Sequence, residues 1–367
     1  MTAHTPTRSQ QPNRCSLNIT GQRIECLPQD VLEQAIEKQI TALDASDNHL
    51  TILPDEIGML RHLERLALGD NLLVALPTGI GKLGRLRWLD VTHNRLSQLP
   101  DQLADCHALT ALGLSDCSFR DFPQVVCRLS GLVKLGFFNN GVSTVPREIG
   151  LLSKLQKLDL SGNNITSLPE EIGNLRNLTW LNLAGNKLSE LPESMRNLTQ
   201  LTEIGLCNNN LTRLPDLSRC SKLKVISAYT NKLSELPDWL ITLPDLEKVD
   251  FSSNRIGKVD GRLFRSLRML QFLNLRENPI SEIFDDERYD GRGRLSRSLQ
   301  KIDLQDCRLP YLPAFLFSRP VDLRVCNNPF TDAFDNSGFE VPRLYQLIES
   351  ANFNNCGTDF TATMGYE

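Results

Sequence analysis

The sequence has little that would place it in a membrane or on a nucleic acid. It contains 40 Lys and Arg against 44 Asp and Glu, a formal net charge of −4, and so lacks the bulk positive charge that binds nucleic acid or an anionic lipid surface. No apolar run approaches the roughly 18 residues of a membrane-spanning helix. The segment MTAHTPTRSQQPNRC is polar and has no apolar core of a secretory signal peptide. We therefore expect no nucleic-acid partner, no membrane span and no secretion.

Recognisable chemistry is also scarce. The ten cysteines include no Cys-x-x-Cys pair and are spread along the chain, which argues against a zinc site and against a disulfide framework. A reducing compartment such as the cytoplasm is the better interpretation. The sequence also lacks a P-loop, a GxSxG elbow, an HExxH motif and a kinase signature. We expect no catalytic residue, no cofactor and no bound metal, and therefore not an enzyme.

What the sequence does contain is a repeat. The pattern LxxLxLxxN occurs at residues 63–71 and again at residues 178–186, and both copies continue as xLxxLP. The last position of the pattern, called n below, recurs in seven consecutive steps of 23 residues and then in steps of 22, 23, 24, 29 and 21. It is occupied by Asn48, Asn71, Asn94, Cys117, Asn140, Asn163, Asn186, Asn209, Asn231, Asn254, Asn278, Cys307 and Asn328. A fixed period of this length indicates stacked structural repeats.

The physical chemistry of one repeat predicts the architecture. Two leucines that are two residues apart predict a short strand with one buried face, and so short a strand is stable only when it pairs with the next copy. The Asn amide can bond to backbone groups of neighbouring copies, and Cys117 and Cys307 fit the same slot as small, weak donors. Proline in the LP step suits a return segment outside the sheet. The sequence therefore predicts an α/β solenoid of 13 or 14 coils with one continuous core.

This pattern resembles the leucine-rich repeat family over roughly residues 15 to 330. The tail LPxxIGxL, present at residues 53–60 and 168–175, is similar to one intracellular subclass, which includes the plant Ras-group-related repeat proteins and the repeat regions of Scribble and erbin. The resemblance implies a horseshoe with a parallel β-sheet on its concave face. It also implies a signalling adaptor or scaffold whose partners are proteins such as small GTPases, phosphatases or scaffold components.

The ends of the solenoid should be capped, because an open end would expose the core. We expect a disordered tail at 1–14, a cap at 15–40, the solenoid at 41–330, and a cap helix with a tail at 331–367. In the first cap, Asp30 and Glu33 predict a capping box that opens a short helix. The second cap has a proline-started helix with Leu344, Leu347 and Ile348 on one face.

Two alternative functions remain open. The carboxyl-terminal cap resembles that of cytosolic animal repeat proteins, some of which are substrate receptors of cullin ubiquitin ligases. The docking box of those receptors has a cysteine where Ile348 stands in this chain. Since similar repeats occur in bacteria, a bacterial effector-type repeat protein is the other alternative.

Residues 281–298 lengthen one coil and are acidic first and then basic. A solvated bulge is one interpretation, because loops tolerate insertions. A second docking element, or a modification site at Ser296 or Ser298, is the other.

The concave face is the candidate binding surface. Side chains at n−6, n−4, n−2 and n−1 should point away from the core, and five of them are aromatic: Trp88, Phe138, Trp180, Tyr229 and Phe272. Exposed aromatics among charged residues are typical anchors of protein interfaces. We expect partner contacts from these five together with Lys134, Lys157, Asp90 and Arg276. The alternative is that the aromatic rings stack laterally on neighbouring coils.

One cluster at n−1 suggests different chemistry. Asp70, His93 and Asp116 come from successive coils and should lie side by side, with Asp90 nearby. Two carboxylates around an imidazole could hold a divalent metal. The favoured interpretation is a solvated histidine with ordinary ion pairs.

Overall fold

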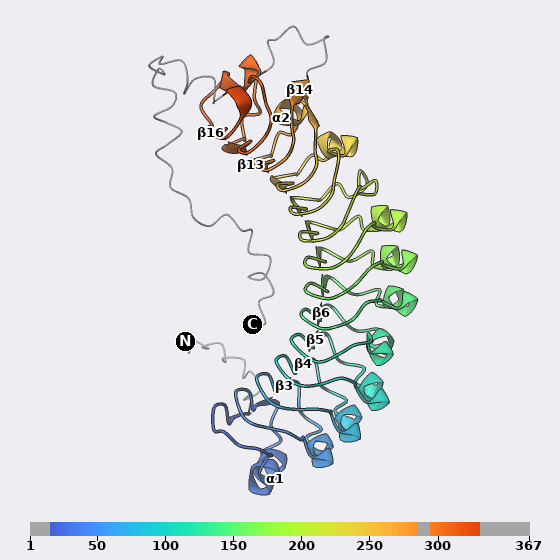
Figure 1. Cartoon of the computed structure of the whole chain (residues 1–367). Helices are drawn as coiled ribbons and strands as arrows, with labels where there is room; N and C mark the ends of the chain where they lie inside the picture. The colour runs from blue at the N-terminus through green and yellow to red at the C-terminus, as the bar shows by residue number, and fades with distance from the viewer. Residues whose placement is uncertain (1–14, 285–293, 331–367) are drawn as a thin grey trace, which may run out of the picture. The chain divides into compact units, whose positions relative to one another are not determined.

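The computed structural model describes residues 15–284 and 294–330, which divide into two compact units. Within the described ranges, one unit comprises residues 15–119 and 123–135, and the other comprises residues 120–122, 136–284 and 294–330. Each unit is a stack of coils in which the strands line one side and short helices line the opposite side (Figure 1).

The strands are three residues long, and from β2 onward each strand of the main sheet begins at n−6. The first unit contains β1 (Ser16–Asn18), β2 (Ala42–Asp44), β3 (Arg65–Ala67), β4 (Trp88–Asp90) and β5 (Ala111–Gly113), and β6 (Lys134–Gly136) spans the division between the units. The main sheet of the second unit contains β7 (Lys157–Asp159), β8 (Trp180–Asn182), β9 (Glu203–Gly205), β10 (Val225–Ser227), β11 (Lys248–Asp250), β13 (Phe272–Asn274), β15 (Lys301–Asp303) and β16 (Asp322–Arg324). A separate pair is formed by β12 (Lys258–Asp260) and β14 (Glu282–Phe284).

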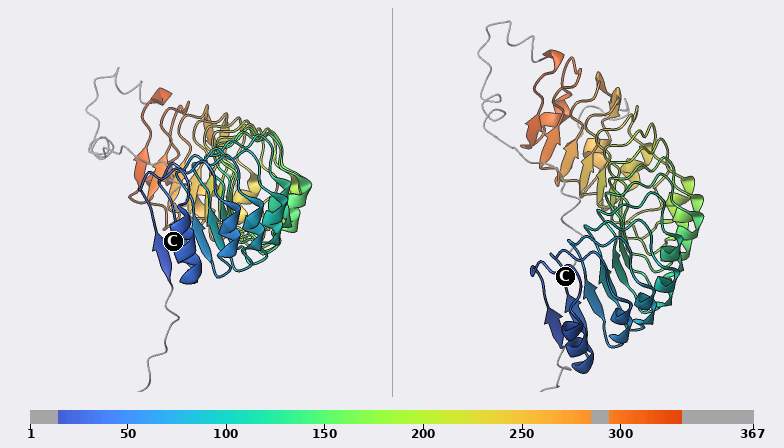
Figure 2. Two further views of the ribbon diagram at one scale, coloured as in Figure 1. Left: turned by 90° about the horizontal axis from the view of Figure 1, so that it is seen from below. Right: turned by 60° about the horizontal axis from the view of Figure 1, so that its bottom comes forward.

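Neighbouring strands within each unit pair in parallel and without offset. Arg65 lies opposite Trp88, and Trp88 lies opposite Ala111. Residues at the same position of successive repeats therefore lie side by side in a row across the sheet. Figure 2 shows the strands of each unit side by side and pointing the same way. The α/β solenoid that the repeat predicts is thus confirmed within both units.

The return segments are mostly 3-10 helices that begin directly after the proline of the LP step. They are η1 (Asp55–Met59), η2 (Thr78–Lys82), η3 (Asp101–Asp105), η4 (Gln124–Arg128), η5 (Arg147–Leu151), η6 (Glu170–Asn174), η7 (Glu193–Asn197), η8 (Asp238–Thr242) and η9 (Ala314–Phe317). The preceding proline is extended, as Pro54 and Pro169 show with ψ of 151°, and its missing N–H is not needed there.

Glycine lets consecutive 3-10 helices pack closely. A Cβ on Gly58 of η1 would collide with the backbone oxygen of Gly79 in η2. A Cβ on Gly173 of η6 would collide in the same way with the backbone oxygen of Ser194 in η7. The glycine of the LPxxIGxL tail is therefore required by the distance between coils.

The Asn at n joins each coil to its neighbours. Asn71 donates from Nδ2 to the carbonyl oxygens of Leu68 in its own coil and Ala45 in the preceding one, both at 3.0 Å, and its Oδ1 accepts from the backbone N–H of Leu50. In the same slot, Cys117 Sγ lies 3.5 Å from the oxygen of Val91. The expected role of the Asn amides and of the cysteine that replaces them is confirmed.

The amino-terminal helix α1 (Gln29–Glu37) is present, but the expected capping box is wrong. Pro28 is the N-cap and no side chain caps the helix, so Asp30 lies inside the first turn. Its carboxylate there still suits the positive end of the helix dipole. The tail at 1–14 and the cap helix and tail at 331–367 lie outside the described residues.

The long coil at 281–298 is described only in part. Within it, Ser296 is buried and its Oγ lies 2.9 Å from Ser298 Oγ, which donates to the carbonyl oxygen of Leu270. Ser296 is therefore closed to a modifying enzyme, whereas Ser298 is half-buried, and a docking role of this coil stays a prediction. Of the helices in the described ranges, none has the length and apolarity needed to cross a bilayer.

Candidate functional site

The solvent-facing side chains of the main strands form the surface of interest, which we call the sheet face. It consists of the side chains at n−6, n−4 and n−2. In β4, for example, Leu89 is fully buried, whereas Trp88 and Asp90 on the opposite side are half-buried. Because strand side chains alternate, each three-residue strand presents two side chains on this face.

In the first unit, the sheet face forms a hollow around one tryptophan. The guanidinium carbon of Arg65 lies 4.8 Å from the centroid of the Trp88 ring, a cation–π contact. The hollow has a volume of about 210 Å³ and is lined by Thr41, Ala42, Glu64, Arg65, Arg87, Trp88, Thr110 and Ala111. The small side chain of Ala111, next to Trp88 in register, keeps this side of the ring open. The hollow can thus hold an apolar group against the ring and an acidic group against the two arginines.

The arginines around Trp88 are the part of this site that the sequence prediction missed. Arg65 stands at n−6, one coil before Trp88, and Arg87 directly precedes Trp88 in the chain. Both positions could have been read from the repeat once the register of the coils was known. The predicted Asp90 lies on the same strand as Trp88, and its Oδ1 accepts from the backbone N–H of Thr92 at 3.0 Å.

In the second unit, three of the predicted aromatics remain half-buried on the sheet face: Phe138, Tyr229 and Phe272. The Lys301 ammonium lies 5.3 Å from the centroid of the Phe272 ring. Burial, and then the neighbouring Cys207 thiol, raise the pKa of the Tyr229 hydroxyl. Tyr229 is therefore a neutral hydrogen-bonding group at neutral pH.

The predicted cationic residues lie in different surroundings. Lys134 and Lys157 are half-buried at the first positions of β6 and β7. Arg276 is exposed, and its guanidinium reaches Asp306 at 3.0 Å and Glu277 at 3.1 Å. Trp88, Asp90 and Lys134 belong to the first unit, and the other predicted contact residues belong to the second.

The expectation that Trp180 is exposed is wrong, since its side chain is only 3% exposed. Its partners in register are Lys157 of β7 and Glu203 of β9. The burial agrees with the alternative interpretation, in which the ring packs against neighbouring coils, and we no longer expect Trp180 to be a primary contact residue.

The n−4 positions of the second unit's sheet face hold a row of mostly buried polar groups. Asp159 and Asp250 are buried. Each accepts from the serine two residues later, Ser161 or Ser252, through the hydroxyl at 2.6 Å and 2.7 Å and through the backbone N–H. Asn274 donates to Asp250 at 3.1 Å. Burial raises the pKa of both carboxyls despite these hydrogen bonds.

The n−1 residues have a conformational role that the sequence prediction missed. In all thirteen coils the residue at n−1 has a positive φ, with values of 54°, 54° and 51° at Asp70, His93 and Asp116. Asp, Asn, His and Gly adopt this left-handed conformation more readily than other residues, which explains the composition of the column.

In the cluster around His93, the imidazole lies close to one of the carboxylates. Nε2 of His93 lies 3.6 Å from Oδ2 of Asp116, and the His93 side chain is exposed. Throughout the described ranges, no group of three His, Cys, Asp or Glu residues is placed to hold a metal ion.

Comparisons with known proteins point to one family. A family model described as a leucine-rich repeat region matches residues 102–231, and one described as a leucine rich repeat matches residues 61–119 and 230–280. A search of curated proteins gave no match to this chain.

Solved structures give the same result. A leucine-rich repeat protein of Leptospira interrogans is 28% identical, with a TM-score of 0.68, over 85% of this chain and 90% of that chain. The plant peptide hormone receptor RGFR1, solved in complex with RGF2, is also 28% identical, with a TM-score of 0.69, over 83% of this chain but only 50% of the receptor chain. An internalin (InlF) of Listeria monocytogenes shares the fold, with a TM-score of 0.70 and 20% identity, over 85% of this chain and 86% of that chain. With the repeat, the coil geometry and the family models in agreement, the chain belongs to the leucine-rich repeat family.

Proposed function

We propose that this protein is a non-catalytic adaptor that binds a partner protein or peptide on its sheet face. The observation that carries the proposal is the hollow around Trp88, where an accessible aromatic ring lies beside Arg65 and Arg87. A Trp ring next to arginines is the combination most enriched among residues that dominate binding energy at protein interfaces. The similarity to a plant receptor solved with a peptide hormone supports a protein or peptide as the partner.

Binding would use two sets of contacts. In the first unit, an apolar side chain of the partner packs on Trp88, while an acidic group pairs with Arg65 or Arg87. In the second unit, the partner packs on the half-buried rings of Phe138, Tyr229 and Phe272. Cationic groups for its acidic residues come from Lys134 in the first unit and from Lys157 and Arg276 in the second. Charged groups of this kind select among partners and speed association more than they add affinity.

We place this role in the cytoplasm, as a signalling adaptor or scaffold of the intracellular repeat subclass. Nine cysteines of the described residues are free, and five of them are buried in the solenoid. Buried free thiols are typical of proteins that fold in a reducing compartment. The small GTPases, phosphatases and scaffold components that the resemblance implies are the partner classes to test first.

The test is proximity labelling in cells that express wild-type protein, the double variant Trp88→Ala/Phe272→Ala, or the control Phe317→Ala. Phe317 is an exposed residue of η9 on the helix side of the second unit, so its replacement removes an aromatic ring from the opposite surface. We expect the double variant to lose the partners that wild type and control retain, while it stays folded and loses only a little thermal stability. Identical sets of labelled proteins from all three forms would contradict sheet-face binding, and substrate turnover by the purified chain would contradict a non-catalytic role.

A further inference from the structure

The regular packing of outer helices ends at η7 in the second unit, because the following coil has no outer helix, and it does not resume at η8. Where η6 has Gly173, η8 has Ile241, and the next coil replaces the 3-10 helix with strand β12 and the one-turn helix α2 (Leu263–Ser266). Without the glycine that permits close approach, and without a matching helix in the next coil, the outer segments cannot nest. A hollow of about 190 Å³ remains between η8 and the β12–β14 pair.

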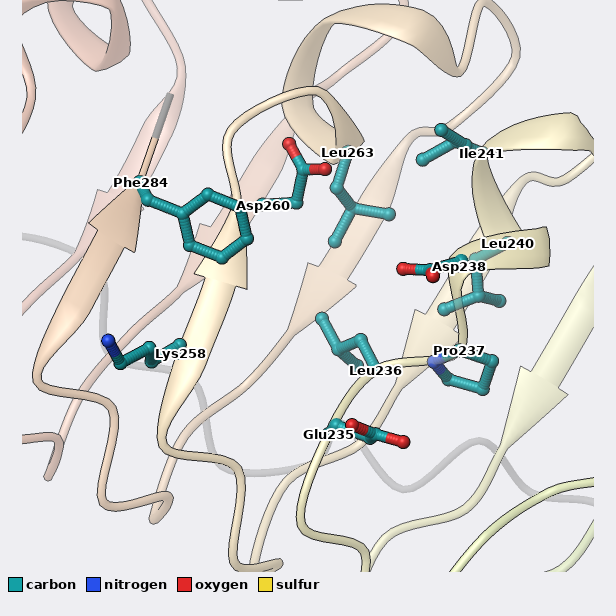
Figure 3. A pocket seen from close by; sticks show the side chains of 10 residues that line it. All are labelled: Glu235, Leu236, Pro237, Asp238, Leu240, Ile241, Lys258, Asp260, Leu263 and Phe284. Carbon is teal, nitrogen blue, oxygen red and sulfur yellow. The ribbon is translucent and has the colours of Figure 1, made fainter. Parts of the chain in front are cut away.

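The floor of this hollow is apolar. Leu240 and Leu263 are buried at its base, and Leu236, Pro237 and Ile241 are half-buried on the side of η8. Figure 3 shows Phe284, the last residue of β14, on the opposite side, facing the hollow. Phe284 is 42% exposed, so its ring offers an accessible apolar surface beside the floor of the hollow.

The rim of the hollow is acidic. Glu235, Asp238 and Asp260 line it together with one cation, Lys258 (Figure 3). The ammonium of Lys258 is paired with Glu282 at 2.7 Å, and Asp260 accepts from the Nε of Arg262 at 2.6 Å. Because each of these two ion pairs has no net charge, the remaining charge of the rim comes from Glu235 and Asp238. These two carboxylates give a net charge of −2 on the side of η8.

The size of the hollow limits what can occupy it. Pockets that enclose a small molecule or a cofactor measure about 300 to 1,000 Å³, so this one is too small for such a ligand. A single large apolar side chain from another protein is a better fit, and the two unneutralised carboxylates call for arginine or lysine beside it.

We propose that the hollow between η8 and the β12–β14 pair is a docking site for a basic segment of a partner protein. One leucine or phenylalanine of the segment enters the hollow against Phe284 and Ile241, and its neighbouring arginines or lysines pair with Glu235 and Asp238. The site lies on the helix side of the second unit and uses none of the proposed sheet-face contacts. The protein can therefore hold a second, positively charged partner while the sheet face is occupied.

The test uses a fluorescein-labelled peptide, Gly-Arg-Arg-Phe-Arg-Arg-Gly, titrated with the full chain while fluorescence anisotropy is recorded. The decisive variant is Glu235→Lys/Asp238→Lys. Its matched control is Glu190→Lys/Glu193→Lys, which occupies the same repeat positions two coils earlier and makes the same change in net charge. Both pairs of side chains are exposed, so neither change should disturb the fold.

We expect the Glu235→Lys/Asp238→Lys variant to bind the peptide at least about tenfold more weakly than wild type, whereas the control changes Kd by less than about threefold. Phe284→Ala should weaken binding about fivefold, and Leu151→Ala, at another exposed outer position, should not. Replacing the peptide's phenylalanine with glycine should have the same effect as Phe284→Ala. Equal weakening by both lysine pairs would reduce the binding to non-specific charge attraction and overturn the proposal.

Sedimentation of the chain alone tests a different occupant. We expect the sedimentation coefficient to be unaffected by Glu235→Lys/Asp238→Lys at every protein concentration. If wild type instead self-associates and this variant does not, the occupant is a second copy of the chain, and the proposal of a basic partner is overturned.

Discussion

The Nδ2 of Asn186 donates to the carbonyl oxygen of Leu160, in the preceding coil, at 2.9 Å. The same amide also donates to the carbonyl oxygens of Leu183 and Ala184, and its Oδ1 accepts from the backbone N–H of Ile165 at 3.0 Å. One buried side chain thus satisfies backbone groups of two coils, which is why the repeat keeps an amide at this position.

Replacing Asn186 with Ala should lower the free energy of unfolding by about 2 to 4 kcal/mol, because buried backbone groups then lose their partners. Asn186→Cys should cost less, since Cys117 and Cys307 already occupy this slot and contact backbone oxygens at 3.5 and 3.6 Å. Urea unfolding followed by circular dichroism measures both. Asn164→Ala, at a half-buried neighbouring position, is the control, and an equal loss there would contradict the role of the amide.

The close packing of outer helices predicts a second stability effect. In Gly173→Ala, the added Cβ would lie 2.6 Å from Ser194 Cβ and closer still to the Ser194 backbone oxygen. Because backbone cannot move aside as a flexible side chain can, we expect a loss of about 1 to 3 kcal/mol. Gly257→Ala is the matched change in the same unit, since a Cβ there has no atom within 4 Å. Thermal melts that show the same loss for both glycines would rule out the steric explanation.

The register of the coils was predictable from the sequence, whereas the exposure of individual side chains was not. Two leucines two residues apart, repeated every 23 residues, admit one strand register, because a shift by one residue would expose every buried leucine. Trp88 and Trp180 occupy the same position of the pattern and were therefore predicted alike. Their neighbours in register differ: the small Ala111 lies beside Trp88, whereas the longer Glu203 lies at the corresponding place beside Trp180.

Irregular features were beyond the reach of the repeat for a related reason. A periodic pattern predicts what every coil shares, and the hollow beside η8 exists where consecutive coils differ. In the sequence, the repeat is irregular at Ile241 and at residues 258–260. Whether this irregularity leaves a hollow depends on how two dissimilar outer segments pack, which the repeat does not predict. The left-handed residues at n−1 could have been predicted, because Asp, Asn and Gly fill most of that column.

The burial of Trp180 predicts that the two tryptophans respond differently to truncation. Trp180→Ala should destabilise the protein by about 3 to 5 kcal/mol, as removal of a large buried aromatic does. Trp88→Ala should cost no more than about 1 kcal/mol, since its ring is partly solvated. Chemical unfolding of the two variants measures this difference. Comparable losses would mean that Trp88 is a packing residue, and would remove it from the proposed binding site.

The buried carboxylates predict a pH dependence of stability with a definite sign. Burial raises the pKa of Asp159 above its ordinary value of 3.8, so the folded protein binds this proton more tightly than the unfolded chain does. The contribution of Asp159 to the free energy of unfolding therefore falls as pH rises from below 3.8 through the raised pKa. Asp159→Asn removes this dependence, and we expect the stability of the variant relative to wild type to increase with pH across that window.

Asp55 provides a control of opposite sign. The backbone N–H of Gly79 and then the hydroxyl of Thr78 donate to its carboxylate and lower its pKa below 3.8. The Asp55 carboxylate stabilises the folded protein above pH 3.8, and this stabilisation is lost as pH falls from 3.8 through the lowered pKa. Asp55→Asn lacks this contribution. Relative to wild type, the variant should therefore become less stable as pH rises from the lowered pKa to 3.8. Urea unfolding between about pH 3 and pH 7 compares the two variants. Parallel curves for Asp159→Asn and wild type would show that burial does not disfavour the Asp159 carboxylate.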